Sequence, residues 1–206
     1  MMFPIMLQTR LSPMFQLTRL LLVLPALLLA PLSTATAEDN WTYVLQDQKL
    51  KLPKQPKPRP DISFEAADGA FLITDKNSEA HGLVRIAYPL EDTGSASIIV
   101  EAKVKLIEGH AVLMVVGSQR QIAMELTPGK LFFGKQTAEV DTTGFHVYRI
   151  VLSKALATVS VDGKELLSGP SSPLKESIPA NQIMISTGDS SNTGQSAWEF
   201  VRFLLE

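Results

Sequence analysis

The sequence lacks cysteine, a phosphate-binding glycine motif and any apolar run long enough to span a membrane. Without cysteine, the 206 residues form no disulfide, thiolate metal site, cysteine nucleophile or lipid-modified N-terminal cysteine. Neither G-x-G-x-x-G nor G-x-x-x-x-G-K-[ST] occurs, so nucleotide chemistry has no support. The formal net charge of -2 argues against nucleic acid as a partner. With 45% hydrophobic residues, however, the chain is able to bury a core.

The first 37 residues have the features of a secretory signal peptide. The uncharged apolar run at residues 20–32 is preceded by Arg10 and Arg19 and is too short for a span of about 20 residues. Ala35-Thr36-Ala37 has the small-x-small pattern of a cleavage site, so we expect cleavage after Ala37 and export to the periplasm or the extracellular space. Met14 is an alternative start, and an uncleaved anchor is the alternative to cleavage. Once cleaved, the chain keeps no transmembrane anchor.

Cleavage would leave 169 residues with 17 basic and 21 acidic side chains, a net charge of -4, because the leader holds two of the bases and none of the acids. Residues 38–48 carry Trp41, Tyr43, Val44 and Leu45, which favour an extra strand docked on the domain. Residues 49–60, the Lys/Pro strap, alternate prolines with basic residues and predict an extended polyproline-like segment. This strap is either a solvated spacer, the simpler interpretation, or a cationic contact to an acidic polymer or membrane surface.

From residue 62 onward the chain alternates apolar and polar residues in short runs separated by glycine, proline or aspartate. Residues 97–107 are the clearest case, because Ile98, Val100 and Val104 face one way and Glu101 and Lys103 the other. Pro128-Gly129 and Asp162-Gly163 are typical of hairpin turns. The expected strands lie in residues 71–74, 82–88, 97–107, 111–116, 121–126, 130–133, 146–152, 157–161, 181–186 and 198–205. They predict an all-β fold, a two-sheet antiparallel β-sandwich at residues 62–206, after the leader (1–37) and the N-terminal segment with its strap (38–61).

Two stretches carry a more specific pattern. Residues 143–152 (TGFHVYRIVL) lead to residues 159–164 (VSVDGK), and residues 188–203 end in WEFVRF. These stretches resemble the F-H-x-Y-x-I … V-D-G-K strand and turn, and the closing strand, of the concanavalin A-like lectin/glucanase superfamily, in particular the laminin G-like jelly rolls of secreted bacterial proteins. The resemblance implies a jelly roll, and its members include lectins, hydrolases, lyases and inert modules.

The catalytic motifs of that superfamily are missing from the chain. No E-x-D-x-x-E string supplies the paired carboxylates of a family 16 glycosidase, and we expect Glu101 and Lys103 to form an exposed ion pair instead. Gln121-Ile122-Ala123 lacks the histidine of the Q-I-H strand of alginate-lyase-like jelly rolls. Gly188-Asp189-Ser190 has no histidine after it to complete a triad. We therefore assign no catalytic residue.

A calcium site is the one metal site with any sequence support, and no cofactor is required. Asp75, Asn77 and Glu79 place oxygen ligands two residues apart, which is compatible with structural calcium, although an ordinary polar turn explains the same residues. The three histidines, His81, His110 and His146, do not have the spacing of zinc ligands.

Sugar binding requires aromatic side chains beside amides or charges on an accessible face. Two aromatic candidates are Trp198, as a platform at the rim, and Tyr148, although both are also explained as core residues. The polar candidates are Arg149, Arg85 and Gln121. The sequence thus favours an exported, non-catalytic module that binds carbohydrate or a cell-envelope polymer. A glycan-active hydrolase or lyase with an unrecognised site, and a protein-interaction or scaffold module, are the alternatives, and the oligomeric state is open.

Overall fold

The computed structural model describes residues 40–52, 61–76, 84–91, 97–188 and 193–206, without the side chains of residues 84 and 85. The chain divides into two units, residues 1–37 and 38–206, and all described residues belong to the second. The expected leader, residues 53–60 of the Lys/Pro strap, and the candidate ligands Asn77 and Glu79 lie outside the described residues.

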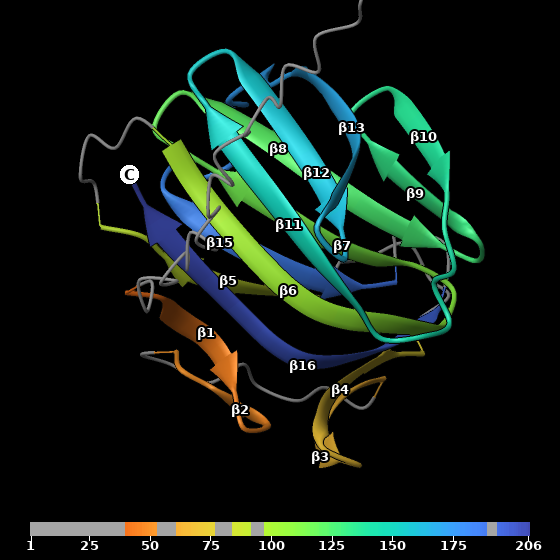
Figure 1. Ribbon diagram of the computed structural model, residues 1–206. Helices are drawn as coiled ribbons and strands as arrows, with labels where there is room; N and C mark the ends of the chain where they lie inside the picture. Colours follow the sequence, from red (N-terminus) through yellow and green to blue (C-terminus); the bar gives the residue numbers. More distant parts are fainter. Residues whose placement is uncertain (1–39, 53–60, 77–83, 92–96, 189–192) are drawn as a thin grey trace, which may run out of the picture. The chain divides into compact units, whose positions relative to one another are not determined.

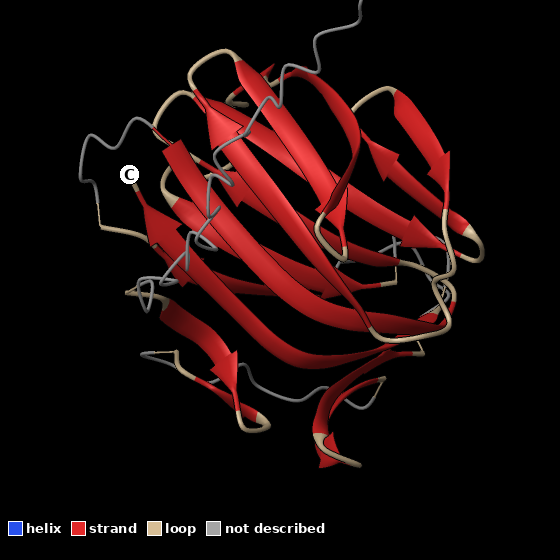
Figure 2. Ribbon diagram, viewed as in Figure 1, coloured by secondary structure: helices blue, strands red, loops and turns tan. Residues whose placement is uncertain are grey.

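The described residues form two antiparallel sheets packed face to face (Figures 1 and 2). The main path of the nine-stranded sheet has the order β13 (Lys164–Pro170), β12 (Leu156–Val161), β11 (His146–Ser153), β6 (Ser97–Glu108), β16 (Gly194–Leu205), β1 (Thr42–Gln46), β2 (Lys49–Leu50). The hairpin of β3 (Ile62–Ala67) and β4 (Ala70–Asp75) joins this sheet because β4 also pairs with β16. The N-terminal segment therefore does contribute a strand to the sandwich, since β1 pairs with β16.

The seven-stranded sheet lies behind the first in the view of Figure 1. Its order is β10 (Gln136–Glu139), β9 (Lys130–Phe133), β8 (Arg120–Thr127), β7 (Ala111–Val116), β15 (Gln182–Thr187), β5 (Val84–Pro89), with β14 (Ser172–Pro173) paired to β8. The described residues include no helix (Figure 2), and so none long and apolar enough to cross a membrane. The predicted all-β, two-sheet antiparallel sandwich is confirmed.

The core lies between the sheets and follows the period-two pattern. On β6, Val100, Ala102 and Val104 are fully buried and pack in one cluster with Leu113 and Ile185 of the facing sheet. Because successive side chains of a strand point to opposite faces, the intervening residues of β6 point outward.

The predicted turns are present at the ends of the expected strands. Asp162 and Gly163 both have positive φ, 49° and 80°, as a two-residue hairpin turn requires, and they join β12 to β13. Gly129, with φ of 74°, closes the hairpin of β8 and β9. The strands β3, β10 and β13 were not among the expected ones, because their exposed residues do not alternate cleanly between apolar and polar.

Candidate ligand site on the outer face of the nine-stranded sheet

A row of polar side chains crosses four strands on the outer face of the nine-stranded sheet. Arg149 of β11 is paired with Glu101 of β6, Glu101 with Arg202 of β16, and Arg202 with Tyr43 of β1. Directly paired residues share one face of a sheet, so these four side chains are neighbours although their positions span most of the chain. A register shift between Trp198 and Phe200 of β16 directs Arg202 outward while Val201 and Phe203 stay in the core.

Glu101 is at the centre of this row and is only 8% exposed. Arg149 Nη1 donates to Oε1 at 3.1 Å, while Arg202 donates to Oε2 through Nε at 3.0 Å and Nη2 at 2.6 Å. The expectation of an exposed Glu101–Lys103 ion pair is wrong, since Lys103 pairs with Glu199 at 2.6 Å. Alternation predicts the outer face for Glu101 correctly. The arginines that cover its carboxylate lie on the neighbouring strands β11 and β16, which are far from β6 in the sequence.

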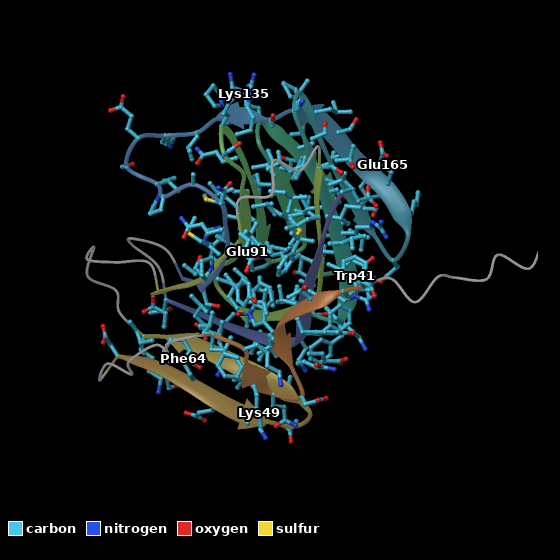
Figure 3. All side chains as sticks on the ribbon, turned by 90° about the vertical axis from the view of Figure 1, so that its left-hand side faces the viewer. Trp41, Lys49, Phe64, Glu91, Lys135 and Glu165 are labelled. Carbon is cyan, nitrogen blue, oxygen red and sulfur yellow. The ribbon has the colours of Figure 1, made fainter. Side chains whose placement is uncertain are left out.

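Aromatic side chains complete the site. The Trp41 ring centroid lies 4.3 Å from the guanidinium carbon of Arg202 and 5.9 Å from that of Arg149. Arg202 Nη1 also donates to the Tyr43 hydroxyl at 3.4 Å. Figure 3 shows Trp41 on the side of the molecule formed by the nine-stranded sheet. Stacking on an indole ring fixes a guanidinium in place and attracts it electrostatically.

The row holds two cations around one buried anion, an excess of one positive charge. Partial burial lowers the pKa of Arg202, but the hydrogen bonds to Glu101 and Tyr43 outweigh this effect and leave the pKa above its ordinary value. Arg202 therefore stays charged. The exposed fraction of the side chain is 41% for Arg149 and 28% for Arg202. We call Trp41, Tyr43, Glu101, Arg149 and Arg202 the arginine–tryptophan site.

Comparison with known proteins finds relatives by structure alone. No protein-family profile and no curated protein matches the sequence. Among solved structures, an alginate lyase of polysaccharide lyase family 7 superposes with a TM-score of 0.51 at 13% identity, covering 81% of this chain and 94% of that one. An alginate lyase from Corynebacterium sp. gives a TM-score of 0.48 at 12% identity, covering 73% and 83%, and a galectin from Caenorhabditis elegans gives 0.39 at 10%, covering 57% and 90%.

This chain has the fold of a concanavalin A-like jelly roll. The expectation from residues 143–164 and 188–203 is thereby confirmed for the fold. At such low identity the likeness carries no activity, so the site has to be read from this chain's own residues.

The jelly roll does not bring the five predicted ligand-binding residues together. Arg149 belongs to the arginine–tryptophan site, whereas Arg85 pairs with Ser186, and Gln121 with Ser172, in the other sheet. Gln121 is itself 5% exposed. Sequence reasoning missed Trp41, Tyr43 and Arg202. For Arg202 a signal was present, because it alternates with the apolar residues Val201 and Phe203 and should therefore face outward.

The two predicted aromatic contacts are core residues of the jelly roll. Trp198 and Tyr148 are both fully buried, and the Trp198 indole N–H donates to Ser196 Oγ at 2.7 Å. The expectation of a rim platform at Trp198 is not met, because the Trp198 side chain lies on the inward face of β16 and packs in the core. Burial also raises the pKa of the Tyr148 hydroxyl well above its ordinary value, with nearby Asp162 and Asp141 adding to the effect.

His146, the first residue of β11, lies between two carboxylates. Its Nδ1 lies 2.6 Å from Asp162 and its Nε2 3.7 Å from Asp141. Asp162 also accepts the Val147 backbone N–H at 2.9 Å. The hydrogen bonds from His146 and Val147 lower the pKa of Asp162, so this arrangement fixes the turn between β12 and β13 against β11.

The structure describes one of the three predicted calcium ligands. Asp75 is buried at the end of β4, and the other two candidate ligands lie outside the described residues. Within the ranges that the structure describes, no three histidine or acidic side chains are gathered for a metal ion.

Proposed function

We propose that this chain is an exported, non-catalytic jelly-roll module that binds carbohydrate or a cell-envelope polymer through the arginine–tryptophan site. The observation that carries the proposal is the pair of guanidinium groups held in place by one buried carboxylate and stacked on Trp41. The similar fold of an alginate lyase, an enzyme that acts on a polysaccharide, supports a carbohydrate ligand.

The site has the physical properties of a binding surface. Because Glu101 and Trp41 hold the arginines before a ligand arrives, little side-chain entropy is lost on binding. Of the five N–H donors of Arg149, the described contacts to Glu101 use one, and its side chain is 41% exposed. An aromatic ring beside free donors is what hydroxyl-rich sugars require from a protein surface.

The same geometry argues for binding rather than catalysis. A retaining glycosidase needs two carboxyl groups about 5 Å apart on either side of one bond. Glu101 is covered by two arginines and Glu199 is paired with Lys103, so the two carboxylates within this group of side chains are engaged by cations. The hydrolase or lyase alternative predicts new reducing ends or unsaturated products from a polysaccharide panel, and their appearance would replace this proposal.

Binding is tested on a glycan array with protein secreted from an expression host through its own leader. We expect retention on at least one glycan class and loss of most of that signal in Arg149→Ala. The matched control is Lys130→Gln, which changes an exposed cation in β9 of the other sheet. An absence of retention on every glycan, or equal loss in both variants, would count against the site.

Export is tested on the same preparation. N-terminal sequencing of the secreted protein should begin at Glu38, since Ala35-Thr36-Ala37 supplies the cleavage pattern. A protein that stays in the membrane fraction with residues 1–37 attached would indicate an uncleaved anchor.

A further inference from the structure

A second group of cations lies on the same outer face as the arginine–tryptophan site. Lys103 and Lys105 follow Glu101 along β6 at every second position, and residues two apart on a strand share a face. Both ammonium groups approach the ring of Phe145, Lys103 at 5.8 Å and Lys105 at 4.8 Å from its centroid. The group thus repeats the composition of the first site, cations fixed against an aromatic ring.

Together the two groups form one line along β6. The distance from Glu101 to Lys105 is four residues of extended strand, or about 14 Å at 3.4 Å per residue. Trp41 stands over the arginines at one end, Phe145 lies against the lysines at the other, and Phe200 lies between them, paired with Lys103. The line is long enough for several units of a chain molecule, whereas a single sugar would use one end of it.

The charge of this line differs in sign from that of the whole protein. Four cations, Arg149, Arg202, Lys103 and Lys105, are set against the two anions Glu101 and Glu199. Further acids flank this line. Glu108 of β6 pairs with Gln195 beyond Lys105, Asp162 interacts with Lys103 and is paired with His146, and Glu165 of β13 is separated from Arg149 by Ser160 of β12. Counted over its own six charged side chains, the line has two more positive than negative charges, on a chain whose net charge is -2, or -4 after cleavage of the leader.

We infer that the outer face of the nine-stranded sheet binds an extended anionic polysaccharide that runs along β6 from Trp41 to Phe145. This inference rests on the proposed function and adds the ligand class and its direction on the sheet. Carboxylate or sulfate groups of the glycan would meet the four cations, and its sugar rings would pack on Trp41, Phe200 and Phe145. A compact neutral sugar would leave the excess charge of the line without a counterpart.

The test is a calorimetric titration of the full secreted chain with hexasaccharides of equal length. Oligogalacturonate supplies carboxylates, a heparin-derived hexamer supplies sulfates, and maltohexaose is neutral. We expect one of the anionic hexamers to bind at least about tenfold more tightly than maltohexaose, and the difference to shrink when the salt is raised, because exposed charges are screened. Equal affinity for maltohexaose, or no binding of any hexamer, would overturn the inference. The proposed function is overturned as well only if the glycan array also shows no retention.

The direction along β6 is tested with Lys105→Gln, which removes a cation far from the buried carboxylate. We expect a loss of about fivefold in affinity for the anionic hexamer and no change with the matched control Lys130→Gln. If Arg149→Ala weakens binding and Lys105→Gln does not, the extended line is wrong. Equally tight binding of polyphosphate or of anionic lipid vesicles would show a charge contact without glycan recognition and would also overturn the inference.

Discussion

Replacing Glu101 by glutamine tests the electrostatic organisation of the arginine–tryptophan site. The substitution keeps the shape of the side chain and removes the negative charge that holds the two guanidinium groups. Breaking a fully buried pair costs about 3–5 kcal/mol, and an exposed pair contributes about 0–1 kcal/mol. The Glu101 side chain is 10% exposed while the arginines keep 41% and 28%, so the expected loss falls between these limits, at about 2 kcal/mol.

The assay is urea unfolding followed by tryptophan fluorescence and circular dichroism. A loss of about 2 kcal/mol lowers the midpoint at an unchanged slope and lowers Tm by about 4–8 °C for a domain of this size. Glu199→Gln is the matched control, because Glu199 is 33% exposed and pairs with a lysine that is 34% exposed. We expect that control to change the stability by less than about 1 kcal/mol. Equal effects of the two substitutions would refute the reasoning that burial makes the Glu101 pair the stronger one.

Three further predictions concern the core, the turn and the site. Tyr148→Phe should leave stability unchanged or raise it, because the buried hydroxyl has no hydrogen-bond partner in the described structure; a Tm lower by several degrees would contradict this. The lowered pKa of Asp162 predicts stability that is complete above its ordinary value of 3.8 and is lost as the pH falls further, so Asp162→Asn should flatten the Tm profile between pH 5 and 2; an unchanged profile would count against it. Trp41→Ala should weaken glycan binding about fivefold through loss of stacking while sparing the fold, and normal affinity would remove Trp41 from the site.

The strands and the core were largely predictable because burial imposes a period of two. Residues 97–107 show this well, since Val100 and Val104 are fully buried as their spacing predicts. The residue pairing across strands was not predictable, because alternation fixes the face of a side chain and says nothing of the neighbouring strand. Glu101 illustrates the difference: it was placed on the correct face and given the wrong partner.

The site was harder to predict than the fold for the same reason. Arg149 and Arg202 lie 48 and 101 residues from Glu101 along the chain and meet it only because β6 runs between β11 and β16. Trp198 was a candidate for a rim platform because the last strand was expected to begin at residue 198, whereas β16 begins at Gly194 and Trp198 lies within it on the core side. Trp41 comes from a segment that pairs with the far end of the sequence, and no local pattern indicates that contact.

The most direct test of glycan binding at the arginine–tryptophan site uses the two tryptophans of the chain as internal reporters. In a ¹H–¹⁵N NMR titration with the tightest-binding glycan, each indole N–H gives one signal. Because Trp41 lies on the outer face of the nine-stranded sheet and Trp198 is fully buried, we expect the Trp41 signal to shift in a saturable manner and the Trp198 signal to stay in place. A glycan that binds without moving the Trp41 signal would show that the arginine–tryptophan site is not the binding site.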